Sequence, residues 1–227
     1  MAGISLLQFE PPVSFTAGKL AGEILDLCRR NGHKGLSRVR LAVFRGDGGL
    51  YDPLNHFPNY IIQAWPLEPG SAGLNQNGLE IGIFPDGRKS CDPYSNLKSN
   101  NYLLYVLAAL YAGRRQLNDC LVLNSHGRIA DSTISNLFWC RKGEIFTPPL
   151  SEGCVAGVMR RWLLEVLPAA GYVLREKTTT AEDLAGAEEV FLTNAMRPVR
   201  WVKAFRGTNY GAQLATSIFH EVIRKMP

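Results

Sequence analysis

The sequence lacks the features that mark several common classes of protein. No apolar run approaches the roughly 18 residues that a membrane-spanning helix needs. The N-terminus has no basic region followed by an apolar core, so we expect no secretory signal. Lysine and arginine give a net charge of +5 but are scattered along the chain. We therefore expect neither a membrane nor a nucleic-acid partner.

Cysteine is sparse, and its spacing argues against cysteine-based frameworks. The chain has 5 cysteines, an odd number, and none of them forms a C-x-x-C pair. A disulfide scaffold or a structural zinc site is therefore not expected, and the 4 histidines show no metal-ligand spacing. We expect no metal and, as the default for such a chain, a reducing cytoplasmic location.

The chain is long enough for two modest domains with cores of their own. It has 227 residues, of which 46% are hydrophobic and 20% are charged. A turn-rich passage at residues 85–96 contains Asp86-Gly87 and Asp92-Pro93 and predicts a domain boundary. We expect a small, incomplete N-terminal α/β domain at residues 1–88 and a larger C-terminal α/β domain at residues 89–227.

Strands and helices are mixed without strict alternation, which predicts a mixed α+β (α/β) architecture. Apolar spacing and capping signals predict helices at residues 19–30, 99–112, 158–167 and 213–225. Strands are expected at residues 37–44, 60–65, 79–84, 120–124, 136–140, 144–147 and 190–193. Residues 141–143 predict a hairpin, and Thr180 with Asp183 predicts the N-cap of a short helix.

Lys98 lies just before or within the first turn of the helix predicted at residues 99–112. The positive end of a helix and partial burial both favour a neutral amine, the form that attacks a carbonyl carbon. For a lysine chosen at random, however, a solvated surface position is the more frequent explanation. A chemical role for Lys98 therefore depends on the segments that follow it.

Five segments that begin at Lys98 form a pattern that is specific only when they are taken together. In chain order they are K-S-N-N-Y-L, L-V-L-N-S-H-G-R-I-A-D-S-T-I-S-N-L-F, E-I-F-T-P-P-L, G-C-V-A-G-V-M-R and E-E-V-F-L-T-N-A. This order resembles the fold-type IV enzymes that depend on pyridoxal 5'-phosphate (PLP), such as branched-chain aminotransferases and aminodeoxychorismate lyases. The resemblance implies a two-domain fold and covers essentially the whole second domain.

The resemblance implies roles for two ionisable residues. Lys98 would bond the PLP aldehyde and, once substrate releases it, move the Cα proton as acid and base. Asp131 stands where the family usually has a glutamate that keeps the pyridine nitrogen protonated. Because aspartate is one methylene shorter, it would reach through a shifted backbone or a water, or the electron sink would be weaker. The alternative is that Asp131 only caps the turn at residues 131–133.

The resemblance also implies contacts to the cofactor ring and to the substrate. Tyr102 would contact the ring hydroxyl, with a packed helix tyrosine as the alternative. Arg197 and Arg200 are candidates to bind a substrate carboxylate, with surface charges as the alternative.

Two loops would bind the cofactor phosphate. A helix entered after Gly157 would offer the amides of Val158 and Met159. The loop after an apolar strand would complete the site with Thr193, Asn194 and Ala195. Each loop taken alone is also compatible with a simple connection.

Two motifs of the family are not in the sequence. Members usually begin with Y-G-D-x-x-F-E and then H-x-x-R-L, whose arginine binds the cofactor phosphate, and the chain contains neither. We expect a fragment or a late start, with a true short enzyme and a relative without turnover as alternatives. The missing arginine removes a charge-assisted contact of roughly 1.5–3 kcal/mol, so PLP should bind roughly ten to a hundred times more weakly.

The expected activity follows from the resemblance alone. The first expectation is an aminotransferase that moves an amino group between an amino acid and a 2-oxo acid, in the manner of branched-chain aminotransferases. The alternative is a 4-amino-4-deoxychorismate lyase that releases pyruvate and 4-aminobenzoate, and the second alternative is a catalytically weak relative. We also expect a homodimer that acts on a small molecule.

Overall fold

The computed structural model describes residues 2–48, 51, 54–68 and 73–226. The chain forms two compact units, Met1–Ser71 and Ala72–Pro227. The boundary expected at residue 88 differs, because the strand β3 (Leu79–Lys89) belongs to the sheet of the larger unit. The turn signals after Phe84 coincide with an irregularity between Ile83 and Arg88 in the pairing of β3, so they do not mark a linker.

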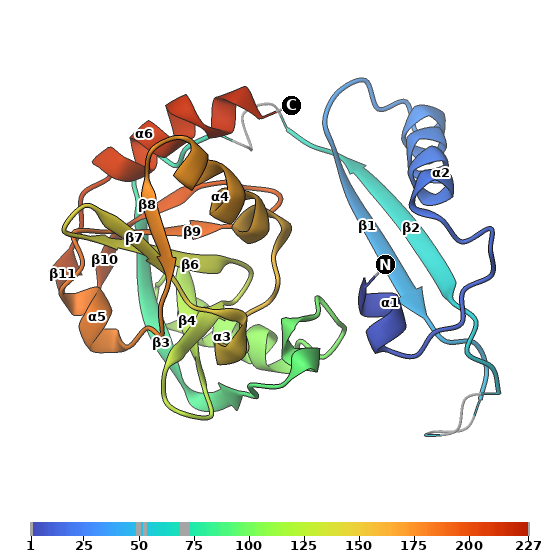
Figure 1. Cartoon of the computed structure of the whole chain (residues 1–227), viewed down its shortest axis with the longest axis horizontal. Helices are drawn as coiled ribbons and strands as arrows, with labels where there is room; N and C mark the ends of the chain where they lie inside the picture. The colour runs from blue at the N-terminus through green and yellow to red at the C-terminus, as the bar shows by residue number, and fades with distance from the viewer. Residues whose placement is uncertain (1, 49–50, 52–53, 69–72, 227) are drawn as a thin grey trace. The chain divides into compact units, whose positions relative to one another are not determined.

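The smaller unit is built on a two-stranded antiparallel sheet and one long helix, coloured blue to cyan in Figure 1. Its elements are α1 (Ala2–Leu6), α2 (Ala17–Arg30), β1 (Ser37–Phe44) and β2 (Asn59–Pro66). Thr16 caps α2 by accepting a hydrogen bond from the Lys19 amide at 3.1 Å. The Glu23 carboxylate on α2 accepts a hydrogen bond of 2.7 Å from the Tyr60 hydroxyl, which joins the helix to β2.

The larger unit is built on a nine-stranded mixed sheet. Its strand order is β5-β4-β3-β10-β9-β6-β7-β8, with β11 paired to β10. Besides β3, the strands are β4 (Asp119–Asn124), β5 (Ile129–Ser132), β6 (Asn136–Arg141), β7 (Glu144–Thr147), β8 (Val173–Glu176), β9 (Glu189–Thr193), β10 (Arg200–Phe205) and β11 (Thr208–Asn209). Strands β4, β6 and β9 are almost entirely buried, as strands with apolar residues on both faces must be.

Helices pack against this sheet (Figure 1). They are η1 (Pro93–Asn96), α3 (Leu103–Arg114), η2 (Leu150–Glu152), α4 (Val158–Ala169), α5 (Ala181–Ala185), α6 (Gln213–Glu221) and η3 (Ile223–Lys225). Alternate residues of one strand enter different clusters: Leu137 and Trp139 join one core cluster, and Phe138 joins the cluster formed with α4 and α6. The sheet therefore buries both faces and provides a rigid frame for the loops at its edges.

Several local predictions are confirmed, and one helix start is wrong. Lys142 and Gly143 have φ of 53° and 73°, as a tight hairpin between β6 and β7 requires. Thr180 and Asp183 form a reciprocal capping box at α5. The helix expected from residue 99 instead begins at Leu103, because the Ser99 hydroxyl accepts the Asn101 amide at 3.3 Å and offers the backbone an alternative to the helix.

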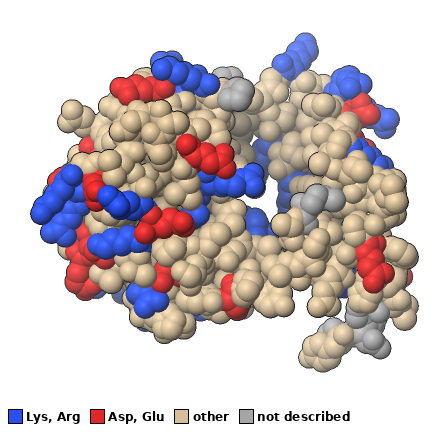
Figure 2. Space-filling view, viewed as in Figure 1, with Lys and Arg blue, Asp and Glu red and all other residues tan. Residues whose placement is uncertain are grey.

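The surface carries charges of both signs. On the face drawn in Figure 2, basic and acidic side chains are interspersed over the larger unit. No helix within the described residues is long and apolar enough to cross a membrane. In the same part of the chain, no group of histidine, cysteine and acidic side chains has the arrangement of a metal site.

Candidate active site

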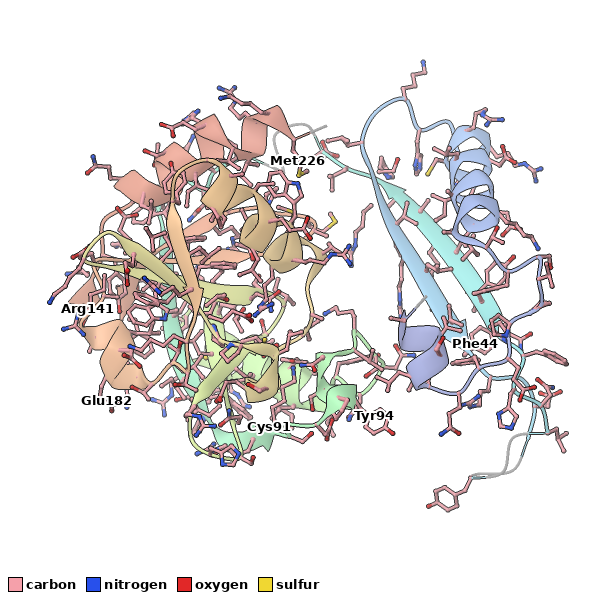
Figure 3. The ribbon with its side chains drawn as sticks, viewed as in Figure 1. Phe44, Cys91, Tyr94, Arg141, Glu182 and Met226 are labelled. Atoms are coloured by element: carbon pink, nitrogen blue, oxygen red, sulfur yellow. The ribbon has the colours of Figure 1, made fainter. Side chains whose placement is uncertain are left out.

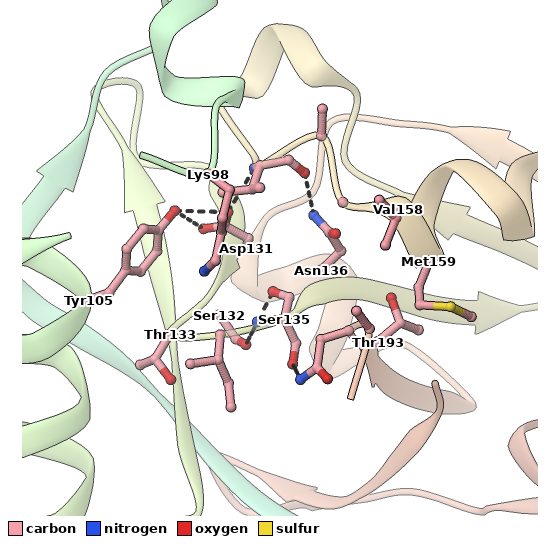
Figure 4. A pocket seen from close by; sticks show the side chains of 16 residues that line it. Lys98, Tyr105, Asp131, Ser132, Thr133, Ser135, Asn136, Val158, Met159 and Thr193 are labelled. Atoms are coloured by element: carbon pink, nitrogen blue, oxygen red, sulfur yellow. Dashed lines mark hydrogen bonds between the residues drawn. The ribbon is translucent and has the colours of Figure 1, made fainter. Parts of the chain in front are cut away.

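One pocket of the larger unit collects most of the residues singled out from the sequence (Figure 4). Its wall comes from the loop before α3, the β5–β6 turn, the segment that leads into α4 and the end of β9. The sequence-predicted residues that line it are Lys98, Asp131, Gly157, Val158, Met159, Thr193, Asn194 and Ala195. Tyr102, Arg197 and Arg200 are not among its lining residues.

Lys98 lies in the loop between η1 and α3, and its side chain extends toward the Asp131 side of the pocket (Figure 4). The loop is exposed but anchored. Asp92 caps η1 by accepting the Ser95 amide at 2.8 Å, and Tyr94 marks this turn in Figure 3. The Asn96 side chain donates through Nδ2 to the carbonyl oxygen of Cys154 at 2.7 Å, which ties the turn to the segment before α4. Lys98 is thereby positioned at the mouth of the pocket while its amine remains accessible.

Asp131 is the buried carboxylate of the pocket, with 2% of its surface exposed. Its Oδ2 atom accepts hydrogen bonds from Lys89 Nζ at 3.1 Å, from the Tyr105 hydroxyl at 3.0 Å and from the Val155 amide at 2.9 Å. Burial raises the pKa of the Asp131 carboxyl, and the Lys89 ammonium and the Val155 amide oppose that rise. The bonds to three other elements are more than a turn cap makes, so the carboxylate is a fixed part of the pocket wall.

The tyrosine at this pocket is Tyr105 and not Tyr102. Tyr102 is the N-cap residue of α3 and is 48% exposed. Tyr105, three residues further along the helix, lines the pocket and donates its hydroxyl to Asp131. Burial, together with the Asp131 charge, raises the pKa of Tyr105 well above its ordinary value, so the hydroxyl keeps its proton. The helix expected at residues 99–112 already contained Tyr105, but no motif in the sequence marked it as a pocket residue.

The β5–β6 turn is held in place by a second buried carboxylate, that of Asp119. Its side chain accepts hydrogen bonds from the Ser132 hydroxyl at 3.0 Å and from the Thr133 hydroxyl at 2.7 Å. It also accepts the Thr133 amide at 3.2 Å. Because both hydroxyls are already engaged on their donor side, Ser132 and Thr133 hold the shape of the turn that carries Asp131.

The segment that enters α4 is held against β6. The Asn136 side chain donates to the carbonyl oxygen of Val155 at 2.8 Å. A Cβ atom at Gly157 would lie 2.1 Å from Asn136 Oδ1, so glycine is required there by close approach. Gly157 has no side chain to cap the first turn of the 12-residue helix α4. The amides of Val158 and Met159 therefore remain available to an anion at the positive end of the helix.

Thr193 carries the strongest sign that the pocket binds a polar ligand. It is 1% exposed, and its hydroxyl oxygen is buried with no hydrogen-bond partner among the described residues. An unpaired buried hydroxyl costs free energy, so such groups are normally paired. The side chain of the next residue, Asn194, is occupied, since its Oδ1 atom accepts the amides of Met196 and Arg197 at 2.9 and 2.8 Å. Asn194 shapes the loop, and Thr193 offers the free hydroxyl.

The two arginines expected to bind a substrate carboxylate lie on the turn and strand after this loop. Arg197 is exposed, whereas Arg200 on β10 is partly buried and its Nε atom has no partner in the described part of the chain. Burial and the neighbouring Arg197 lower the pKa of Arg200. Neither side chain lines the pocket, so their role toward a substrate stays a prediction.

Comparisons with known proteins give the family. The model described as "Amino-transferase class IV" matches residues 4–205, and the chain belongs to this family. Aminodeoxychorismate lyase of Bacillus subtilis (strain 168) is 31% identical over 210 residues, which covers 89% of this chain and 70% of the lyase. Branched-chain-amino-acid aminotransferase of Escherichia coli (strain K12) is 26% identical over 208 residues, which covers 88% of this chain and 66% of that protein.

Solved structures give the fold. Branched-chain amino acid aminotransferase of Thermobaculum terrenum in its PLP-form matches with a TM-score of 0.87 at 19% identity, covering 99% of this chain and 74% of that one. The family resemblance and the mixed α/β fold expected from the sequence are thus confirmed. The chain spans between 59% and 70% of the length of the curated relatives that it matches first.

Proposed function

We propose that this chain is a PLP-dependent enzyme in which Lys98 holds the cofactor. The observation that carries the proposal is one pocket that combines an accessible lysine, a buried carboxylate and an unpaired buried hydroxyl, that of Thr193. The family membership and the PLP-form relative of the same fold support it. The residues present fit the cofactor at its phosphate end, at its ring and at its reacting carbon.

The phosphate end is proposed to lie at the entrance of α4. The amides of Val158 and Met159 and the hydroxyl of Thr193 bind the phosphate oxygens, with Ala195 and Asn194 shaping the loop. The absence of a side chain at Gly157 leaves room for the anion. In this arrangement the phosphate satisfies the hydroxyl that the protein alone leaves without a partner.

The ring end is proposed to lie at Asp131. When bound, PLP supplies a protonated pyridine ring that accepts electrons from the carbon next to the substrate nitrogen. Asp131 holds the proton on the ring nitrogen, and Tyr105 and the Val155 amide orient the carboxylate. Lys98 would remove the proton from the substrate Cα and, once protonated, would act as the acid in the step that follows.

The first candidate reaction is amino-group transfer between an amino acid and a 2-oxo acid, the reaction class named for the Escherichia coli relative. The acid and base steps that Lys98 performs are the ones that such a transfer requires. Arg197 and Arg200 are proposed to attract the substrate carboxylate from the turn and strand next to the pocket.

The second candidate reaction is the release of pyruvate from 4-amino-4-deoxychorismate. The Bacillus subtilis lyase, at 31% identity, is the observation that favours it. Both reactions begin with removal of a proton from the carbon that bears the substrate nitrogen, so the same pocket residues serve either outcome. We also propose that the enzyme is a cytoplasmic homodimer, which sedimentation measurements and cell fractionation would test.

The test begins with cofactor binding and continues to product analysis. PLP is added to the chain, the mixture is reduced with borohydride, and the modified peptide is identified by mass spectrometry. We expect one adduct on Lys98 and none on that peptide in Lys98→Ala. Lys177, a surface lysine paired with Asp183 at 2.8 Å, provides the control substitution Lys177→Ala, which should keep the Lys98 adduct. An unchanged adduct in Lys98→Ala would refute the assignment.

Product analysis then separates the two reactions. Formation of a 2-oxo acid that depends on a second 2-oxo acid as acceptor supports the aminotransferase. Pyruvate and 4-aminobenzoate formed in equal amounts, without an acceptor, support the lyase. A Lys98 adduct with neither product would identify a cofactor-binding relative without turnover.

A further inference from the structure

Lys89 is a buried lysine that the proposed function leaves without a role. Its side chain is only 9% exposed, although lysine is among the residues least often buried. Its ammonium lies 3.1 Å from Asp131 Oδ2 and 5.1 Å from the centre of the Tyr105 ring. Strand pairing fixes its backbone, because Lys89 at the end of β3 is in register with Asn124 on β4. The pocket carboxylate therefore has a cationic partner supplied by the protein itself.

Lys89 is the group that can influence the charge on Asp131 most directly. The titratable groups that face this carboxylate are Lys89 on β3, Tyr105 on α3 and Cys154 ahead of α4, and Lys98 lines the same pocket. Burial raises the pKa of the Cys154 thiol to about 11, and burial and Asp131 raise that of Tyr105, so both are neutral near pH 7. Lys89 and Lys98 are the two lysines at this pocket, and Lys89 alone of the two has a hydrogen bond to Asp131 among the described contacts.

The two carboxylate oxygens of Asp131 have different contacts. Oδ2 accepts three donors, from Lys89, Tyr105 and the Val155 amide. Oδ1 accepts only the Tyr105 hydroxyl, at 3.2 Å, among the contacts in the described structure. A carboxylate offers roughly four lone-pair positions, so most of its remaining acceptor capacity is on Oδ1. A cation within about 4 Å stabilises the charged form of a carboxylate and so weakens its attraction for a proton.

We propose that Lys89 is a positioning residue that holds Asp131 ionised, fixes the rotation of its carboxylate and reduces the strength with which that carboxylate keeps the cofactor ring nitrogen protonated. This inference rests on the proposed function, in which Asp131 faces that nitrogen. Lys89 and the ring nitrogen share one carboxylate. The electron-accepting strength of the ring is therefore set by the Lys89–Asp131 pair and not by Asp131 alone.

The first arm of the test measures the protonation of the ring nitrogen directly. PLP labelled isotopically at that nitrogen is loaded onto the protein, and its nitrogen NMR shift is followed with pH. Removing the Lys89 charge makes Asp131 a stronger proton acceptor, so the ring nitrogen should stay protonated to higher pH. In Lys89→Met and Lys89→Gln we expect the titration midpoint to rise by about one pH unit or more. Lys89→Arg, which keeps the charge, should titrate like the unmodified protein.

A matched control separates this effect from the loss of any lysine pair. Lys203 forms an ion pair with Glu80 at 3.2 Å, nearly the same distance, but both side chains are about half exposed. Lys203→Met should leave the midpoint unchanged. Lys89→Gln also guards against misfolding, because it keeps a hydrogen-bond donor beside Asp131 while removing the charge.

The second arm uses the protein without cofactor. In Lys89→Met, Asp131 loses its cation, and burial then raises its folded-state pKa further above the unfolded value. A raised carboxyl pKa means that stability is present below the unfolded pKa and is lost as pH rises through the folded value. The stability of Lys89→Met, measured by thermal unfolding, should therefore fall more steeply between about pH 4 and pH 7 than that of the unmodified chain.

The outcomes distinguish this proposal from the proposed function. If Lys98 takes PLP and the ring titration does not move in Lys89→Met and Lys89→Gln, the role of Lys89 is refuted and the proposed function stands. If no adduct forms on Lys98 in the unmodified chain, the proposed function fails and this inference fails with it. A shifted midpoint in both neutral variants, with Lys89→Arg and Lys203→Met unchanged, supports the inference.

Discussion

Gly157 and Asn136 approach each other so closely that no side chain fits between them. A Cβ atom at position 157 would lie 2.1 Å from Asn136 Oδ1 and 3.3 Å from Asn136 Cγ. The same asparagine donates to the carbonyl oxygen of Val155 at 2.8 Å, two residues before the glycine. The entrance of α4 and the start of β6 are therefore joined as one rigid corner of the pocket.

Gly157→Ala should disturb this corner and with it the anion site. Displacing Asn136 breaks its bond to Val155, and overpacking of this kind costs about 1–3 kcal/mol of unfolding free energy. PLP affinity, measured by titration, should fall about tenfold or more, because the amides of α4 move. Asn136→Ala in the same chain should relieve part of the steric cost.

A helical glycine provides the control for that substitution. Gly113 lies within α3, and a Cβ atom there would meet nothing within 4 Å. Gly113→Ala should stabilise the protein by about 0.5–1 kcal/mol and leave PLP affinity unchanged. If Gly157→Ala behaved like Gly113→Ala, the corner would not be rigid and the anion site would lie elsewhere.

Asp131→Asn tests the buried ion pair through stability as well as through chemistry. The substitution leaves the Lys89 ammonium buried without a counter-charge, and breaking such a pair typically costs about 3–5 kcal/mol. Chemical denaturation of the cofactor-free protein should show a loss of this size. In the PLP-loaded protein, proton removal from the substrate should slow as well, because the ring nitrogen loses its partner.

The double variant decides whether the cost comes from the pair. Asp131→Asn combined with Lys89→Met should be less destabilised than Asp131→Asn alone, since no unpaired charge remains. Glu80→Gln, which breaks the exposed pair with Lys203, should cost only about 0–1 kcal/mol. A loss in the double variant equal to the sum of the losses in Asp131→Asn and in Lys89→Met would show that Lys89 and Asp131 are not coupled.

The site could be predicted from the sequence where the signal was local or fixed in order along the chain. Lys98, Asp131, Gly157 and Thr193 were singled out from ordered segments, and the pocket brings all of them together. Their roles toward a cofactor stay predictions. The capping box of α5 and the β6–β7 hairpin were likewise predicted, since each depends on a few adjacent residues.

The Lys89–Asp131 pair could not be predicted in this way. The two residues are 42 positions apart and lie on β3 and β5, with β4 between these strands. β5 is only four residues long and gives no periodic signal, and the turn residues after Phe84 indicated a domain boundary where the structure has an irregular strand. Side-chain contacts across a sheet depend on strand order, which local patterns do not contain.

Arg128 and Glu152 should make the larger unit sensitive to acid. Burial alone would raise the pKa of Glu152, but paired hydrogen bonds from Arg128 and one from Asn124 hold that pKa below its ordinary value. A depressed folded-state pKa gives stability that is present above the unfolded pKa, about 4.3, and is lost as pH falls through the folded value.

Unfolding measured over that acid range checks the assignment. The unmodified chain should lose stability as pH falls below about 4.3, and Arg128→Met should show a smaller dependence on pH because the charge that lowers the Glu152 pKa is gone. Arg175, whose pair with Glu144 at 3.1 Å is largely exposed, provides the control, and Arg175→Met should keep the acid dependence. The same slope in Arg128→Met as in the unmodified chain would assign the acid sensitivity to other carboxylates.

Thr193→Val should separate ligand binding from folding more cleanly than any other substitution in the pocket. Valine has nearly the shape of threonine, and the hydroxyl it replaces has no partner in the described structure, so the cofactor-free protein should be as stable as before or slightly more stable. The PLP-loaded protein should lose a hydrogen bond to a charged phosphate, worth about 1.5–3 kcal/mol, which is roughly a ten- to hundredfold loss of affinity.

Thr147 is the matched control, because its buried hydroxyl donates to the carbonyl oxygen of Leu137 at 2.8 Å. Thr147→Val should destabilise the fold without changing PLP affinity. If Thr193→Val destabilised the cofactor-free protein as Thr147→Val does and bound PLP normally, the Thr193 hydroxyl would serve the fold and the phosphate would have to bind elsewhere.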